Sequence, residues 1–209
     1  MDKPGEVYQL SDLREGQALS LPSALKKGKI SLEEALWGRK SVRNFSIDKL
    51  DPDQIGQILW SAQGINRPGS RFKACPSAGA TYPLTAYAVT ADGIFEYIPE
   101  GHRIRKIADG DHRKSLSQAA LGQGWVASAP LSVVITAVYG RTTGRYGDRG
   151  VMYVHMEAGH AAQNIHLQAV ALGLGSVPVG AFSDDKVAKV MGCDRDEVPL
   201  YIIPVGKQL

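Results

Sequence analysis

The segment Leu131–Val138 restricts the fold of this chain more than any other. Its sequence, LSVVITAV, is an almost continuous run of apolar and β-branched residues that directly follows Pro130. Such side chains favour extended backbone, and a run with little polar alternation indicates a central strand rather than an edge. Apolar residues then recur at helical spacing from Val151 to Leu172. Together the two segments predict a sheet with a long helix packed against it.

The remaining segments predict further strands and helices around this pair. Asp51 followed by Pro52 and Gln54 is typical of a helix N-terminus, and this helix is expected to end at Gly64. Apolar patterns predict helices at 32–38, 111–121, 124–128 and 184–191, strands at 84–90, 94–98, 102–107 and 200–205, and loops at 67–74, 141–150 and 173–180. We expect an N-terminal arm at 1–30 and a single α+β domain at 31–209.

Composition excludes several classes of function. The chain has 209 residues, 44% hydrophobic and 22% charged, with a net charge of only +3. Because the cations are scattered and do not alternate with aromatic residues, we expect no nucleic-acid partner. No apolar run is long enough to span a membrane, and the N-terminus carries charges where a signal peptide would be apolar. With only two cysteines, Cys75 and Cys193, and no CxxC, we expect no metal site and a cytoplasmic location.

The first helix is followed by a cluster of cations: Arg39, Lys40, Ser41 and Arg43. Guanidinium groups pair phosphate oxygens bidentately, and a serine hydroxyl adds a neutral donor, so the cluster suits a phosphate dianion. An ordinary basic turn at a helix C-terminus is the alternative.

Three further features fit the same ligand. Pro76-Ser77-Ala78-Gly79 is a loop of small residues whose backbone can approach a planar ring closely. Val177–Ala181 is an apolar loop, and Lys207 follows the last predicted strand. No Rossmann or P-loop motif is present, so a nucleotide would need another kind of site. A phosphorylated flat cofactor such as FMN matches these features together, although each alone is an ordinary turn.

Several motifs occur in an order that resembles the nitroreductase family of FMN proteins. They are Arg39-x-Ser41-x-Arg43-x-Phe45, Pro76-Ser77-Ala78-Gly79, Gly159-His160-x-x-Gln163-Asn164, Gly173-Leu174-Gly175 and Val205-Gly206. The resemblance extends from about Leu19 to Lys207. Leu59–Ile65 and Pro76–Pro83 are similar to the SagB-type branch, which includes thiazole/oxazole-forming oxidases.

The resemblance implies a homodimer of α+β subunits, each with a mixed or antiparallel sheet flanked by helices, and FMN at the subunit interface. Carried over by position, the phosphate, ribityl chain and pyrimidine edge would be held by Arg39, Lys40, Ser41, Arg43 and Lys207. The ring would be contacted by Pro76, Ser77, Ala78 and Gly79 of the other subunit, by Val179, Gly180 and Ala181, and by Gln123. Ala158, Gly159, Ala161 and Ala162 would suit either a dimer interface or close packing within one subunit.

The chain departs from the SagB-type branch at one pair of residues. Azoline oxidases of that branch carry a Lys-Tyr pair where Arg145-Tyr146 stands here. Arginine stays protonated and is a poor general base, so Tyr146 is the expected proton-handling residue. In addition, Gly180 stands where nitroreductases typically have an acidic residue.

Three functions therefore follow from the resemblance. The first is hydride transfer through flavin N5 by ping-pong turnover, from NAD(P)H to a nitro, quinone or other small organic acceptor. Arg43 or Lys40 would stabilise the reduced ring. The second is oxidation of an azoline, or of a related C–N or C–C bond, in a peptide-derived substrate within a modification complex. The third is a non-catalytic flavin-binding module.

Overall fold

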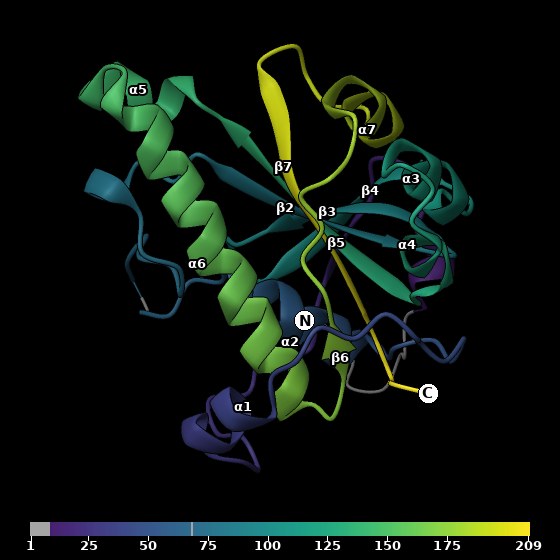
Figure 1. Cartoon of the computed structure of the whole chain (residues 1–209). Helices are drawn as coiled ribbons and strands as arrows, with labels where there is room; N and C mark the ends of the chain where they lie inside the picture. The colour runs from purple at the N-terminus through teal and green to yellow at the C-terminus, as the bar shows by residue number, and fades with distance from the viewer. Residues whose placement is uncertain (1–8, 68) are drawn as a thin grey trace.

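The computed structural model describes residues 9–67 and 69–209. In this part of the chain a seven-stranded sheet has the order β1-β4-β3-β2-β5-β7-β6, and all neighbouring strands are antiparallel (Figure 1). The strands are β1 (Ala18–Ser20), β2 (Leu84–Thr90), β3 (Gly93–Ile98), β4 (Arg103–Asp109), β5 (Leu131–Val138), β6 (Gly175–Ser176) and β7 (Glu197–Gly206).

Strand β5 lies inside the sheet between β2 and β7, as its sequence predicts. Its odd-numbered residues, Leu131 to Ala137, belong to the core on one face, whereas Val134 belongs to the core on the other. Both faces are therefore covered, which is why β5 has little polar alternation.

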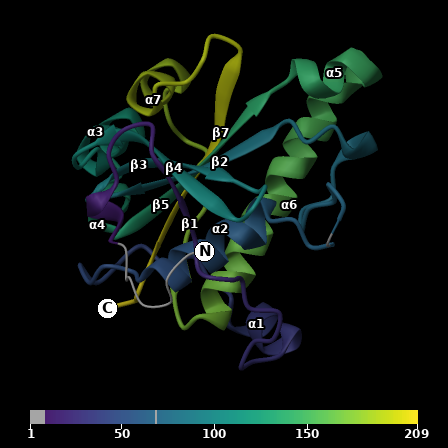
Figure 2. The same ribbon diagram turned by 180° about the vertical axis from the view of Figure 1, so that it is seen from behind.

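Helices cover the two faces of the sheet unequally (Figures 1 and 2). The face with the larger core is covered by α2 and α6, and the other by α3, α4 and α7, while α1 and α5 pack near the two ends of α6. The helices are α1 (Leu32–Gly38), α2 (Pro52–Gln63), α3 (Arg113–Ala119), α4 (Gly124–Ser128), α5 (Gly140–Tyr146), α6 (Arg149–Ala171) and α7 (Asp184–Met191). Within the described residues, no helix is long and apolar enough to cross a membrane.

Helix α2 begins as the sequence predicts. The Asp51 side chain accepts a hydrogen bond from the backbone N–H of Gln54, the Gln54 side chain accepts one from the N–H of Asp51, and Pro52 is the first helical residue. Gly64 ends the helix, as expected.

The predicted loop at 141–150 is wrong over most of its length, because residues 141–146 belong to helix α5 and residues 149–150 begin helix α6. Gly140 and Gly144 lower helix propensity by about 1 kcal/mol each, which is why the sequence indicates a loop. Packing against α6 stabilises the helix instead. Thr142 is buried and its hydroxyl lies 2.8 Å from that of Thr81. A Cβ on Gly150 would lie 2.9 Å from the Cα of Thr143, so glycine there permits the close contact.

Two other predictions need adjustment. Helix α3 is shorter than the predicted 111–121, because Asp111 binds the side chain of Arg113 and Leu121 has a φ of +58°. The expected loop 173–180 contains the short strand β6.

The chain between residues 9 and 30 contributes to the sheet and the core. β1 pairs with the edge strand β4, and Leu10 and Leu21 are buried in the larger core. The first eight residues of the predicted arm lie outside the described residues.

The small residues of α6 divide between two environments. Ala158, Ala161 and Ala162 are buried in the core of their own chain, where α6 contacts α2. They therefore allow close packing within one subunit. Gly159, by contrast, is exposed.

Candidate functional site

The cation cluster lies beside strand β6 as a short extended segment. Ser41 forms a parallel bridge with Ser176, whose carbonyl accepts a 3.0 Å hydrogen bond from the N–H of Val42. A Cβ on Gly175 would lie 2.7 Å from Val42, so only glycine lets the two segments approach this closely. The Gly-Leu-Gly motif thus holds the cluster in place.

The C-terminal end of β7 brings Lys207 to the same segment. Phe45 pairs with Gln208, and the N–H of Ser46 donates a 2.9 Å hydrogen bond to the carbonyl of Lys207. The Lys207 ammonium lies 3.6 Å from Asp48. Lys207 and the cluster, about 160 residues apart in the sequence, are thus neighbours in the fold.

The cluster keeps its charge available. Among residues 9–67 and 69–209, no carboxylate forms an ion pair with Arg39, Lys40 or Arg43. Arg39 is half-buried and the other two are exposed. The guanidinium of Arg43 lies 5.4 Å from the ring centre of Trp125, which holds it by a cation–π contact. Unpaired, positioned cations of this kind suit an anionic ligand.

A buried histidine lies next to the segment that holds the cluster, and no motif in the sequence points to it. His166 is buried, and its Nδ1 lies 2.8 Å from the Ser176 hydroxyl. Burial, with a contribution from Arg39, lowers the pKa of His166 to about 4, so the imidazole is neutral at pH 7.

The loop at 179–181 offers less to a ligand than the sequence suggested. The backbone N–H and C=O of Val179 both pair with Ile202, and its side chain is buried in the core. Gly180 and Ala181 are exposed. The Gln123 amide donates a 2.8 Å hydrogen bond to the carbonyl of Ala181, which anchors this loop to the start of α4. Gln123 and Val179 therefore position the exposed pair.

The other predicted residues meet in a second group. Gly79 adopts a left-handed conformation with φ +58°, and its carbonyl accepts a 3.2 Å hydrogen bond from Arg145. A Cβ at Gly79 would lie 2.5 Å from the Tyr146 hydroxyl. The tyrosine stacks edge-on against Tyr153 at 5.2 Å between ring centres. Arg145 and Tyr146 thus lie directly against the Pro76–Gly79 loop.

The two groups lie at different ends of the long helix. α5, with Arg145 and Tyr146, packs near the N-terminal end of α6, whereas β6 and the cation cluster lie near its C-terminal end (Figure 1). Helix α6 has 23 residues, or about 34 Å at 1.5 Å per residue. Within one chain, the predicted site residues therefore form two separate groups.

A buried carboxyl lies next to the Pro76–Gly79 loop, and no motif in the sequence points to it. Glu157 is 2% exposed, and its Oε1 has no hydrogen-bond partner within the described residues. Burial raises its pKa to about 7, while the Ser77 hydroxyl and Lys73 act in the opposite direction. The backbone carbonyl of Glu157 lies 3.4 Å from the thiol of Cys75, whose own pKa is raised by burial to about 12. This thiol is therefore a structural group.

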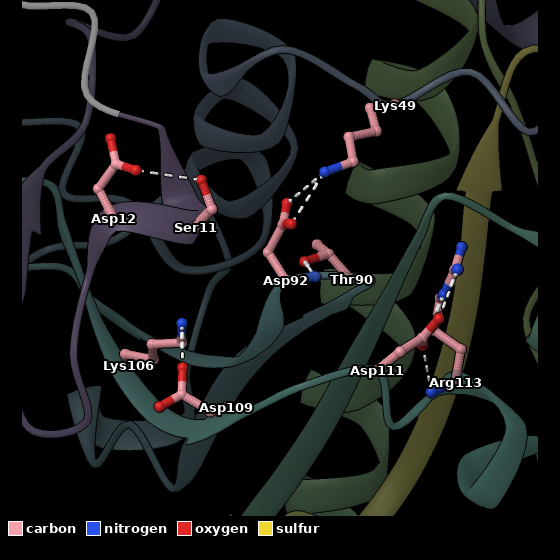
Figure 3. Close-up of polar contacts among 9 residues, drawn as sticks. All are labelled: Ser11, Asp12, Lys49, Thr90, Asp92, Lys106, Asp109, Asp111 and Arg113. Atoms are coloured by element: carbon pink, nitrogen blue, oxygen red, sulfur yellow. Dashed lines mark hydrogen bonds and ion pairs between the residues drawn. The ribbon is translucent and has the colours of Figure 1, made fainter.

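A separate hollow of about 590 Å³ lies between the N-terminus of α2 and the turn that joins β2 to β3. Four of the residues drawn in Figure 3 line it: Lys49, Thr90, Asp92 and Arg113. Its cations are paired: Lys49 lies 2.8 Å from Asp92, and Arg113 lies 2.7 Å from Asp111. Among the described residues, none of the predicted site residues lines this hollow. Its charge is already neutralised, in contrast to that of the cluster.

Comparisons with known proteins identify the family of this chain. The family model described as Nitroreductase family matches residues 36–207, which include both groups of predicted site residues. The chain belongs to the nitroreductase family. The likeness to the SagB-type branch is weaker than the likeness to the family as a whole, as the sequence identities of individual relatives show.

Three relatives of this nitroreductase differ in how similar they are to it. A Methanocaldococcus jannaschii protein named as a nitroreductase is 44% identical over 186 residues, covering 86% of this chain and 92% of its own. A crystal structure from Ralstonia eutropha, also named as a nitroreductase, is 27% identical with a TM-score of 0.85, covering 100% of this chain and 96% of its own. The Escherichia coli microcin B17-processing protein McbC is 24% identical over 75% of this chain, which spans 61% of McbC.

Proposed function

We propose that this nitroreductase is an FMN-dependent oxidoreductase that passes a hydride from NAD(P)H to a nitro, quinone or other organic acceptor by ping-pong turnover. The observation that carries the proposal is the cluster of Arg39, Lys40 and Arg43, which has no acidic partner in the described residues and lies beside Lys207. A phosphate dianion would supply the missing countercharge.

We expect the residues of the cluster to contact different parts of FMN. Arg39 and Ser41 would hold the phosphate, with Lys207 closing its outer side. Arg43, fixed over Trp125, would lie toward the pyrimidine edge, where its charge favours the reduced, anionic ring. Bound FMN would supply hydride transfer at N5. Gly79, which has no Cβ, lets Arg145 and Tyr146 pack directly against the loop that would face the ring.

We propose that the two groups are half-sites of one binding site: the cation cluster with Lys207 is the first, and the Pro76–Gly79 loop with Arg145 and Tyr146 is the second. Their separation within one chain supports a homodimer. If both contact one ring, the second must come from another copy of the chain. An uncovered apolar surface on α6 fits this partner: Val151 is 42% exposed, Met152 44% and Met156 49%, and the exposed Gly159 would permit close approach. We propose that two copies pair through this surface, with FMN between the cluster of one and the Pro76–Gly79 loop of its partner.

A second candidate function is SagB-type dehydrogenation of an azoline or related bond in a peptide-derived substrate. It is favoured by the likeness to McbC and by the position of Tyr146, whose hydroxyl lies against Gly79. This activity would call for a partner protein that delivers the peptide. Arg145 argues against it, because a guanidinium does not accept a proton at working pH.

The first test is the absorption spectrum of the purified protein. We expect a yellow flavin band and release of FMN on denaturation. Arg39→Ala should weaken FMN retention about tenfold or more, since charge-assisted hydrogen bonds contribute about 1.5–3 kcal/mol. Arg43→Ala should in addition shift the flavin reduction potential. Arg195→Ala is the matched control, because Arg195 is exposed in the turn before β7, at the opposite end of that strand from Lys207.

Turnover assays then separate the candidate functions. Consumption of NAD(P)H in the presence of menadione or a nitroarene supports the first, and azoline oxidation without NAD(P)H supports the second. If dithionite reduces the bound FMN but neither NAD(P)H nor the azoline does, the protein is a non-catalytic flavin-binding module. Colourless protein that takes up no FMN would refute all three.

A further inference from the structure

A cavity of about 550 Å³ lies next to the Pro76–Gly79 loop and has no role in the function described so far. Its walls include the charged side chains of Arg67 and Lys73 and the rings of Phe72 and Tyr82. Ser77 and Gly79 form the border that it shares with the second half-site. Whatever occupies the cavity would therefore lie beside the loop that we assign to the flavin.

Lys73 is the central polar group of this cavity. Its ammonium donates a 2.9 Å hydrogen bond to Gln63 Oε1 and lies 4.8 Å from the ring centre of Tyr82. An ammonium has three N–H donors, and within the described residues only one of them has an acceptor, so two are available to a ligand. Lys73 is only partly exposed, and this burial lowers its pKa. A charge held in such a place gains more from an anionic partner than a fully hydrated lysine would.

Two buried side chains next to Lys73 and Ser77 have unused hydrogen-bonding atoms. Gln63 and Glu157 are each 2% exposed, and within the described residues Gln63 Nε2 and Glu157 Oε1 have no partner. Buried polar atoms are rarely left without a partner. Neither side chain lines the cavity itself, and Gln63 is connected to it through the hydrogen bond from Lys73. With its pKa raised to about 7, the Glu157 carboxyl is partly protonated at neutral pH and contributes less negative charge here.

The surrounding charges are mainly positive. Arg145 donates to the carbonyl of Gly79 at 3.2 Å, and Arg141 donates to that of Tyr82 at 3.5 Å, so both lie against residues that line the cavity. Glu100 is close enough to affect Lys73 but does not form an ion pair with it. The rings of Phe72, which is 49% exposed, and Tyr82 add apolar surface. Each ring has a cation over one face, Arg67 at 5.4 Å from the centre of Phe72 and Lys73 at 4.8 Å from that of Tyr82. The combination suits a planar ring that carries an anionic group.

We propose that this cavity holds the carboxylate or phosphate of the planar small molecule that exchanges hydride with the flavin, with Lys73 as the residue that recognises the anion. The proposal rests on the proposed function, because the flavin is assigned to the adjoining loop. The anion could belong to an acceptor, as an aromatic carboxylate, or to the donor, as a nicotinamide nucleotide phosphate. Both present oxygen anions to the same ammonium.

The test is equilibrium binding, measured by titration calorimetry on the purified protein as isolated. The probes are 4-nitrobenzoate, its uncharged analogue 4-nitrobenzyl alcohol, and nicotinamide mononucleotide. Lys73→Met removes the charge but keeps the length of the side chain, and Lys73→Arg retains the charge. Lys186→Met is the matched control, because Lys186 is exposed on α7.

Lys73→Met should weaken binding of at least one anionic probe about tenfold or more, as expected for loss of a charge-assisted hydrogen bond, and should change that of the alcohol less than twofold. Lys73→Arg should restore most of the affinity. Weakening of 4-nitrobenzoate alone identifies a carboxylate acceptor, and weakening of the mononucleotide alone identifies the donor phosphate.

Equal weakening of the alcohol and the anions, or no weakening of either anion, would overturn the proposal. The flavin content of the same samples is read from their absorption. If the protein contains flavin but Lys73→Met does not change its affinity for either anion, only the cavity assignment is refuted. Protein that takes up no FMN refutes the proposed function, whatever the anions do.

Discussion

Replacement of Glu157 by glutamine should change the pH dependence of stability in a defined direction. Burial raises the pKa of this carboxyl from 4.5 to about 7 in the folded protein. Between those values the folded state holds a proton that the unfolded state has released. The stability from this group is therefore complete below about pH 4.5 and is lost as the pH rises through 7.

The size of the effect follows from the pKa difference. At about 1.4 kcal/mol per unit, and with the unfolded carboxyl already partly ionised at pH 5, the parent protein should lose about 2–3 kcal/mol through Glu157 between pH 5 and pH 8. Glutamine has nearly the same shape and does not titrate, so Glu157→Gln removes this loss. For a chain of this size the difference amounts to about 5–10 °C in melting temperature.

The assay is thermal unfolding of both proteins at pH 5 and at pH 8. The gain in melting temperature from Glu157→Gln should be about 5–10 °C larger at pH 8 than at pH 5. His166 acts in the opposite sense: its pKa is lowered to about 4, so its contribution to stability is lost as the pH falls from 6.5 to 4. Because both proteins contain His166, the comparison between them cancels its contribution.

Glu33→Gln is the control for a simple loss of negative charge, since Glu33 is exposed in the first turn of α1. A gain from Glu157→Gln that is the same at both pH values would refute the argument. So would an equal pH-dependent gain in the Glu33 variant.

Two further predictions concern the half-sites and their assembly. Gly175→Ala would place a Cβ 2.7 Å from Val42 and should cost about 1–3 kcal/mol in urea unfolding, with loss of FMN. Gly180→Ala, whose Cβ would lie 3.7 Å from its nearest neighbour, should leave stability unchanged, and equal behaviour of the two variants would contradict the proposed strand contact. Met156→Glu places a charge on the uncovered surface of α6 and should convert the dimer to monomers in light scattering, with loss of FMN. Lys186→Glu on α7 should do neither, and a Met156→Glu protein that stays dimeric would exclude that surface as the interface.

The fold was predictable wherever local sequence and tertiary contacts demand the same structure. The β-branched run of β5, the cap at Asp51 and the helical stripe of α6 all fall where expected. Helix α5 was missed because its two glycines indicate a loop, and only its packing against α6 makes it helical. Local propensity carries no information about such contacts.

For the site, the sequence by itself determined the chemistry: the cations at 39–43, the small-residue loop at 76–79, and the family order of the motifs. Tertiary structure alone decided how these pieces meet. Pairing with β6 and β7 brings Lys207 to the cluster and leaves its cations unpaired, whereas the length of α6 keeps the Pro76–Gly79 loop away from them. The pKa shifts of Glu157 and His166 also depend on burial, because the cost of charging a group is set by what surrounds it in space.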